Sequence, residues 1–253
     1  MRLATRVQGA GPDLVLVHGW GLNAAVWEPL TERLAGRHRL TSIELPGHGA
    51  SPPPGEGTTT ADLVEALLAA APARAAWLGW SLGGLLALAV AQAAPDRITR
   101  LGLLATNPCF TRRADWSCAM VPEVLAGFAR DLETQPQRTL QRFLGLVARG
   151  APSADTLRDL RRRVLDAPAP HPRGLALGLE LLRDRDLRPA LAAVSQPLWL
   201  GFGARDTLVP LAAADAVAAL CPTARITRFE GAGHAPLLSH PDALVTALGP
   251  LLA

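Results

Sequence analysis

The sequence predicts one α/β domain: a mostly parallel central sheet flanked by helices, with a helical insertion in the second half of the chain. Short apolar runs alternate with helix-forming segments up to residue 108 and again from residue 192. Between these parts, residues 109–191 contain no strand-like run, and prolines divide them into helical stretches. A chain of 253 residues that is 49% hydrophobic is long and apolar enough to bury such a core.

Four apolar runs are expected to be the first strands, at residues 13–17, 40–45, 75–78 and 100–105. The segments between them are expected to be helices at 23–34, 61–71 and 82–94, with threonines 58–60 as caps of the second helix. Strands separated by helices form parallel sheets with right-handed crossovers. In such sheets the ligand site lies beyond the carboxyl ends of the strands, so the loops there are where functional residues are expected.

After the insertion, strands are expected at residues 196–202 and 226–229, and a last helix at 241–252. The insertion itself is expected to contain helices at 121–132, 136–149, 153–165 and 173–183. In the second of these, one apolar face is formed by Leu140, Phe143, Leu144 and Val147. We therefore divide the chain into a core (1–108 and 192–253) and a helical lid (109–191) that covers the ligand site.

Residues 79–83 read Gly-Trp-Ser-Leu-Gly and lie between an apolar run and a helix-forming segment. A sharp strand-to-helix turn strains the backbone of its serine and requires small residues two positions away on either side. The turn presents the hydroxyl of Ser81, and it places the N–H of Leu82 at a helix N-terminus, where it faces a developing negative charge. We interpret Ser81 as a nucleophile and Leu82 as an oxyanion donor; the competing interpretation is a helix start with an incidental serine.

A carboxylate and a histidine that suit this nucleophile follow later strands. Asp206 comes after the run at 196–202, and His234 lies in a glycine-rich loop after the run at 226–229. The carboxylate would accept the Nδ1–H of the histidine, fix its tautomer and stabilise the imidazolium. The other position for the acid follows the fourth strand, but Asn107 is uncharged there, and an Asp-to-Asn change in a triad costs about 10⁴ in rate. Asp206 is therefore preferred.

The first apolar run ends in His18-Gly-Trp-Gly21. A turn of this kind directs a backbone N–H at the nucleophile, here that of Trp20, whose side chain would line an acyl pocket. His18 is expected to be structural, and His48 is expected to belong to the turn after residues 40–45. The three remaining histidines are expected at the surface: His38, His171 and His240.

The composition excludes several classes of protein. No apolar run reaches 18 residues without a charge, and the first residues do not resemble a signal peptide. Three widely spaced cysteines fit neither a disulfide framework nor a zinc site, so a reducing cytoplasm is expected. No metal, membrane or nucleic-acid partner is expected.

The charges are unevenly distributed along the chain. The net charge is +3, and every basic residue is an arginine. Residues 138–163 hold seven arginines and two acidic residues, a net charge of +5. A basic patch on an otherwise slightly acidic body indicates an acidic partner.

Several motifs in combination resemble the α/β-hydrolase superfamily, whose triads follow the chain order serine, acid, histidine. More narrowly, the chain is similar to the BioH-like pimeloyl-[acyl-carrier protein] methyl ester esterases of biotin synthesis. The matching motifs are HGWGLN at 18–23, WLGWSLGG at 77–84, Pro-Cys-Phe at 108–110, Asp206 with Leu-Val-Pro at 208–210, and His-Ala-Pro at 234–236 with Ser-His-Pro at 239–241. The insertion also matches at 124–128 and 138–144.

The resemblance implies an α/β-hydrolase fold with a helical lid and a serine esterase without metal or organic cofactor. It implies a catalytic triad of Ser81, Asp206 and His234, with the N–H groups of Trp20 and Leu82 as the oxyanion hole. Substrate-binding residues would be Trp20, Ser81, Leu82, Phe143, Leu144, Gly145, Leu146, Val147 and His234. Residues that dock the carrier protein would be Arg138, Arg142, Arg158, Arg161 and Arg162. The enzyme would be a cytoplasmic monomer whose partner is the acyl carrier protein bearing the methyl-pimeloyl group.

Three alternatives use the same sequence features. A general carboxylesterase for short acyl esters would share the catalytic residues, with its arginines merely solvated. An acyltransferase of this fold would replace water by an alcohol or thiol acceptor. A non-catalytic binding protein would not require Ser81, Asp206 and His234 at these positions, which argues against it.

Overall fold

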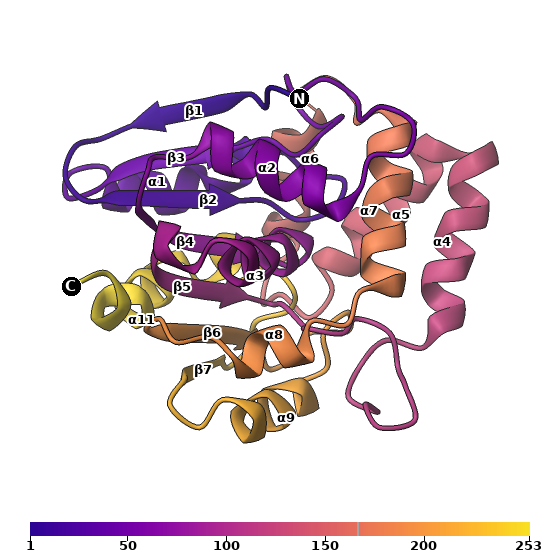
Figure 1. The fold of residues 1–253 in the computed structure, drawn as a ribbon. Coiled ribbons are helices and arrows are strands. Elements are labelled where there is room, and N and C mark those ends of the chain that lie inside the picture. The colour runs from indigo at the N-terminus through magenta and orange to yellow at the C-terminus, as the bar shows by residue number, and fades with distance from the viewer. Residues whose placement is uncertain (166) are drawn as a thin grey trace.

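A seven-stranded sheet forms the centre of the computed structural model, which describes residues 1–165 and 167–253 (Figure 1). Its spatial order is β1-β3-β2-β4-β5-β6-β7, and all neighbours are parallel except β1 and β3. The strands are β1 (Thr5–Gln8), β2 (Asp13–Val17), β3 (Arg39–Ile43), β4 (Ala75–Trp80), β5 (Ile98–Leu104), β6 (Leu198–Gly203) and β7 (Arg225–Phe229). The expected mostly parallel α/β fold is confirmed.

The central strands read as continuous apolar runs because helices cover both of their faces. Every residue of β4 and β6 is buried. The sequence did not reveal β1, because all four of its residues are exposed and it pairs only with β3 at the edge of the sheet. An exposed edge strand lacks the apolar pattern by which strands are recognised.

The core helices cover the two faces of the sheet (Figure 1). They are α1 (Glu28–Leu34), α2 (Thr60–Ala70), α3 (Leu82–Ala93), α8 (Arg188–Ala192), α9 (Ala212–Leu220), α10 (Pro236–Ser239) and α11 (Pro241–Leu252). Helix α2 begins with the expected threonine cap, because Thr59 and Asp62 form a reciprocal capping box. The helix expected at 23–34 divides into a 3₁₀ turn (Ala24–Trp27) followed by α1, and Pro29 lies in the first turn of α1.

Four helices between β5 and β6 form the insertion predicted from the sequence. They are α4 (Pro122–Thr134), α5 (Pro136–Val147), α6 (Asp155–Leu165) and α7 (Pro172–Asp184). Helices α4, α5 and α7 stand beyond the carboxyl ends of the strands, at the right of Figure 1. In the described part of the chain, no helix has the length and apolarity that crossing a membrane requires.

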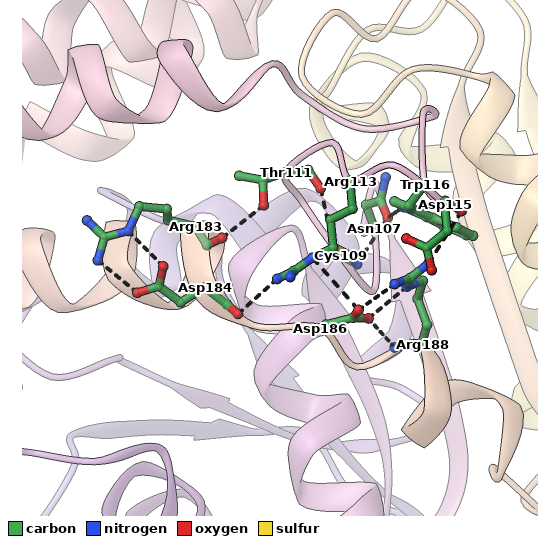
Figure 2. A network of polar contacts seen from close by, with 10 residues as sticks. All are labelled: Asn107, Cys109, Thr111, Arg113, Asp115, Trp116, Arg183, Asp184, Asp186 and Arg188. Atoms are coloured by element: carbon green, nitrogen blue, oxygen red, sulfur yellow. Dashed lines mark hydrogen bonds and ion pairs between the residues drawn. The ribbon is translucent and has the colours of Figure 1, made fainter.

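The two connections of the insertion to the core are bound to each other, and we call this region the clasp (residues 107–116 and 183–188; Figure 2). The N–H of Leu187 donates to the carbonyl of Pro108 at 2.8 Å, and Cys109 and Asp186 form an antiparallel bridge. The hydroxyl of Thr111 donates to the carbonyl of Arg183 at 2.9 Å. The insertion therefore leaves and rejoins the core at one fixed point.

Arg188 is the central cation of the clasp. Its guanidinium pairs with Asp186 at 2.6 Å and with Asp115 at 2.9 Å, and it lies 5.2 Å from the ring of Trp116. These two carboxylates raise the pKa of Arg188, and the hydrogen bond from Arg188 lowers the pKa of the Asp186 carboxyl group. The side chains of Arg188 and Asp186 are only 16% and 26% exposed, so this ion pair is stronger than a typical surface pair.

We predict that Asp186→Asn lowers the free energy of unfolding by about 1–2 kcal/mol at neutral pH, because it removes one charged hydrogen-bond acceptor. The lowered pKa of Asp186 means that its stabilisation is complete above the ordinary aspartate pKa of about 3.9 and is lost as the pH falls below it. Urea unfolding measured from pH 7 to pH 3 should show the difference from wild type shrinking below about pH 4. Asp184→Asn, at a more exposed pair with Arg183, is the control; equal effects of both substitutions would contradict the prediction.

Candidate active site

Ser81 occupies a strained turn between β4 and α3. Its backbone has φ 56° and ψ −119°, a conformation that costs a residue other than glycine about 1–3 kcal/mol. The flanking residues are small because backbones cross here: a Cβ on Gly79 would lie 2.3 Å from the carbonyl oxygen of Gly83. A Cβ on Gly83 would lie 2.1 Å from the carbonyl oxygen of Val17. The structure thus contains the strand-to-helix turn that the spacing of the two glycines predicts.

Asp206 and His234 form a buried pair beyond the ends of β6 and β7. His234 Nδ1 lies 2.7 Å from Asp206 Oδ2, and both side chains are at least 99% shielded from solvent. Asp206 Oδ1 also accepts the N–H groups of Leu208 at 2.8 Å and Val209 at 3.0 Å. The other ring nitrogen of His234, Nε2, is buried without a hydrogen-bond partner among the described residues.

The loops of these residues meet at the same edge of the sheet. The indole N–H of Trp80, the residue before Ser81, donates to the carbonyl of His234 at 2.8 Å, and the two rings lie 5.8 Å apart. A Cβ on Gly203 would lie 2.0 Å from the carbonyl oxygen of Gly233, so the loop of Asp206 touches the loop of His234 directly. The three predicted triad residues are therefore placed on adjoining loops, although they are far apart in the sequence.

The loop that follows β2 runs beside Ser81. A Cβ built on Gly19 would lie 3.4 Å from the Cβ of Ser81, so the next residue, Trp20, begins close to the serine. Leu82 opens helix α3, where the first N–H groups have no partner within the helix. Both predicted oxyanion donors thus flank the serine.

Two buried histidines support this loop. His18 Nδ1 lies 2.8 Å from the carbonyl oxygen of Gly19, and its Nε2 accepts the N–H of Leu45 at 3.0 Å. His48 Nε2 accepts the N–H of Gly21 at 3.1 Å. Burial lowers the pKa of His18 to about 4 and that of His48 to about 3, so both rings are neutral at physiological pH. Their contacts are with backbone groups, in agreement with the structural role expected for His18.

Asn107, the alternative position for the acid, uses its side chain for hydrogen bonds in and beside the clasp (Figure 2). Its Oδ1 accepts the indole N–H of Trp116 at 2.9 Å and the N–H of Cys109 at 3.1 Å. Its Nδ2 donates to the carbonyl of Cys118 at 2.9 Å. The side chain therefore has a structural function, in keeping with Asp206 as the acid.

An aromatic cluster from the lid closes over the loop of Trp20. The Trp20 and Phe143 rings pack edge to face at 4.8 Å, and Phe128 lies 6.2 Å from Trp20 and 6.1 Å from Phe143. The indole N–H of Trp20 donates to the carbonyl of Leu175 in α7 at 2.8 Å. Sequence reasoning did not assign Phe128 or Leu175 to the site, because their proximity depends on how the lid helices pack.

The predicted acyl-binding stretch 143–147 spans two faces of α5. Phe143, Leu144 and Val147 are buried, and Phe143 contacts the loop of Trp20. Gly145 and Leu146 are partly exposed, and a Cβ on Gly145 would meet no atom within 4 Å. The structure thus brings Phe143 to the site, packs the partly exposed Leu146 against the hydrophobic core, and leaves Gly145 at an open position of the helix.

The predicted docking arginines lie on the adjacent helices α5 and α6, and several hold counterions. Arg142 pairs with Asp131 at 2.6 Å and lies 4.4 Å from the Phe128 ring. Arg138 donates to the side-chain oxygen of Gln135 at 3.1 Å. Arg158 pairs with Asp155, and Arg162 pairs with Asp159 at 2.6 Å, while Arg161 is exposed. The ion pairs involve exposed side chains, so breaking them to pair with a partner's charges costs little free energy.

The lid covers this site. Ser81 is 5% exposed and His234 is 1% exposed. Among the described residues, no group of three or more His, Cys, Asp or Glu side chains is arranged to hold a metal ion.

The chain is similar to known proteins along almost its whole length. A model described as "Alpha/beta hydrolase family" matches residues 14–247. The pimeloyl-[acyl-carrier protein] methyl ester esterase of Edwardsiella ictaluri is 46% identical over 246 residues, which cover 95% of this chain and 93% of that protein. The protein of the same name from Stenotrophomonas maltophilia is 45% identical over 246 residues, covering 96% of this chain and 93% of that protein.

Solved structures extend the comparison to the fold. A hydrolase from Pseudomonas aeruginosa superposes with a TM-score of 0.82 at 30% identity, covering 99% of this chain and 94% of that one. An esterase from Exiguobacterium antarcticum superposes with a TM-score of 0.88 at 21% identity, covering 99% and 95%, which shows a common fold.

We predict that Gly79→Ala lowers the free energy of unfolding by about 2–3 kcal/mol, because the new methyl group requires β4 and α3 to separate. The matched control is Gly145→Ala, which adds the same group in open space within a helix and should be neutral or stabilising by up to about 1 kcal/mol. Urea unfolding of both variants measures the difference. A Gly79 variant as stable as wild type would show that the turn tolerates a side chain.

Proposed function

Because this chain belongs to the alpha/beta hydrolase family, we propose that it is a serine esterase that hydrolyses the methyl ester of pimeloyl-[acyl-carrier protein] methyl ester. The products are methanol and pimeloyl-[acyl-carrier protein], in biotin synthesis. The observation that carries the proposal is the buried Asp206–His234 pair, 2.7 Å apart, on loops adjoining the strained Ser81. Relatives that bear this name match the chain over almost its whole length.

The acylation step uses the three side chains in sequence. Nε2 of His234 accepts the proton of the Ser81 hydroxyl while its oxygen attacks the ester carbonyl carbon. Asp206 holds the imidazole in the required tautomer and stabilises the imidazolium that forms. The tetrahedral intermediate then expels methoxide, which leaves as methanol with the proton from His234.

Deacylation repeats the chemistry with water in place of the serine hydroxyl. His234 removes a proton from the water, whose oxygen attacks the acyl carbon. The tetrahedral intermediate expels the Ser81 oxygen, which takes the proton back from His234, and the released acid ionises to the carboxylate. In both steps the N–H groups of Trp20 and Leu82 hold the oxyanion, each contributing about 3 kcal/mol by comparison with other oxyanion donors. The reaction needs no metal or organic cofactor.

The surroundings of Ser81 suit an uncharged ester. The aromatic cluster of Trp20, Phe128 and Phe143 provides an apolar wall, with Leu144 and Val147 buried behind it in α5. A methyl ester enters such a site without the cost of desolvating a charge, whereas the carboxylate product bears that cost and is released. The wall therefore favours substrate over product.

We propose that the carrier protein docks on α5 and α6. Arg138, Arg142, Arg158, Arg161 and Arg162 would contact its acidic surface and the phosphate of its phosphopantetheine arm. Arg142 would exchange Asp131 for such a group, and it adjoins the aromatic cluster through Phe128. The cytoplasmic location and the monomeric state expected from the sequence stay predictions.

Replacing Ser81 by alanine should abolish turnover of a short p-nitrophenyl ester, because it removes the proposed nucleophile while the fold is retained. A fall of at least about 10⁴ in kcat is expected, measured by nitrophenolate release and accompanied by circular dichroism of the variant. Ser239→Ala, at a hydroxyl bound to its own helix, is the control. Retained turnover in the Ser81 variant would identify another nucleophile.

Reversing Arg138 and Arg142 to glutamate should raise KM for the carrier-bound ester at least about tenfold and change the short ester less than about threefold. The reason is that charge attraction acts only on the acidic carrier, and it should weaken further as salt screens it. Arg225→Glu with Arg228→Glu, an equal charge change on β7, is the matched control. Equal losses on both substrates, or a KM insensitive to salt, would contradict arginine-driven docking.

A further inference from the structure

His48 makes a buried contact with the loop of Trp20 that the proposed mechanism does not use. It lies in the turn after β3 and is 1% exposed. Its Nδ1 lies 2.9 Å from the carbonyl oxygen of Pro46, to which it donates, so the unprotonated Nε2 faces Gly21 and accepts its N–H at 3.1 Å. Both ring nitrogens are therefore engaged, and the tautomer is fixed.

The peptide that His48 holds is the one between Trp20 and Gly21. Gly21 adopts φ +69°, and a Cβ built on it would lie 2.7 Å from the side chain of Leu140 and 3.9 Å from that of Phe143, both in the lid. On the other side of Trp20, His18 binds the carbonyl of Gly19, which belongs to the same peptide plane as the N–H of Trp20. A neutral histidine thus holds the backbone on each side of this N–H.

The turn that carries His48 is itself held by the lid. The N–H of His171 donates to the carbonyl of Gly47 at 2.7 Å. A Cβ on Gly174 would lie 2.4 Å from the carbonyl oxygen of Pro46, so α7 packs directly on the turn. His48 therefore stands between α7 and the loop of Trp20, where little freedom is left to the ring.

Its environment keeps the Nε2 lone pair available. Burial is the main cause of its lowered pKa, and the ring of His18, 5.3 Å away, lowers it further. The charged group that acts on it in the opposite direction is the buried carboxylate of Glu44. That carboxylate is bound by the N–H groups of Ala24 and Ala50, so it does not replace Gly21 as the partner of His48.

We propose that His48 is a positioning residue for the esterase reaction: by accepting the Gly21 N–H, it holds the peptide after Trp20 so that the Trp20 N–H points at the oxyanion. This inference rests on the proposed function, since it takes Trp20 as an oxyanion donor. A donor that is free to turn must be reoriented during the reaction, and it loses part of the stabilisation that a fixed donor supplies. His48 acts through the backbone of Trp20 and Gly21 and does not touch the substrate.

The test compares His48→Phe, which removes the acceptor, with His48→Gln, whose side-chain oxygen reaches the position of Nε2. With a short p-nitrophenyl ester, His48→Phe should lower kcat about 10- to 100-fold, less than the loss of a whole oxyanion donor, and change KM less than about threefold. His48→Gln should recover kcat to within about fivefold of wild type. His48→Leu replaces the phenylalanine variant if that variant does not fold, and His38→Phe, at a half-buried site before β3, is the control.

A second readout separates positioning from packing. An alkyl boronic acid forms a tetrahedral adduct with the serine and presents a boron-bound oxygen to the oxyanion donors, so its Ki should rise in parallel with the fall in kcat. A folded acceptor-free variant with wild-type kcat and wild-type boronate affinity would overturn the proposal, as would equal losses in the phenylalanine and glutamine variants. Failure of wild type itself to hydrolyse the ester and bind the boronate would instead overturn the proposed function, and this inference with it.

Discussion

The structure depends on direct contact between backbones at the carboxyl edge of the sheet. A Cβ added to Gly79, Gly83, Gly203 or Gly233 would lie only 2.0–2.3 Å from the carbonyl oxygen of a neighbouring segment. These contacts bring the turn of Ser81 against β2 and the loop of Asp206 against the loop of His234. A side chain at any of them would push the two elements apart, and hydrogen bonds weaken when their atoms are displaced. The polar groups of the site therefore depend on the close packing of these glycines.

The lid shares these contacts. A Cβ on Gly233 would lie 2.0 Å from the carbonyl oxygen of Arg149, which follows α5. A Cβ on Gly150 would lie 2.5 Å from the carbonyl oxygen of Arg205. The lid thus touches the residues that precede both His234 and Asp206, besides binding the indole of Trp20. At its other end it is anchored by the clasp.

Charge is handled differently inside and outside the site. Inside, His18 and His48 are kept neutral by burial, and the carboxylate of Asp206 is held by two N–H groups and an imidazole. On α5 and α6, arginines form exposed pairs such as Arg142 with Asp131. Buried contacts of the first kind define geometry, because an unpaired group there is costly. Exposed pairs of the second kind are weak, and a partner with denser negative charge would displace them.

The sequence by itself determined the order of strands and helices, the helical insertion, and the residues at the carboxyl edge, because apolar periodicity and the spacing of Gly79, Ser81 and Gly83 are local properties. Tertiary structure alone decided the exposed edge strand β1, the clasp around Arg188, and the meeting of Phe128 and Leu175 with Trp20. It also decided that His48, expected only as a turn residue, binds Gly21. Such contacts join segments that are distant in the chain. They form only when whole helices and sheets pack against each other, and a local pattern of residues does not predict that packing.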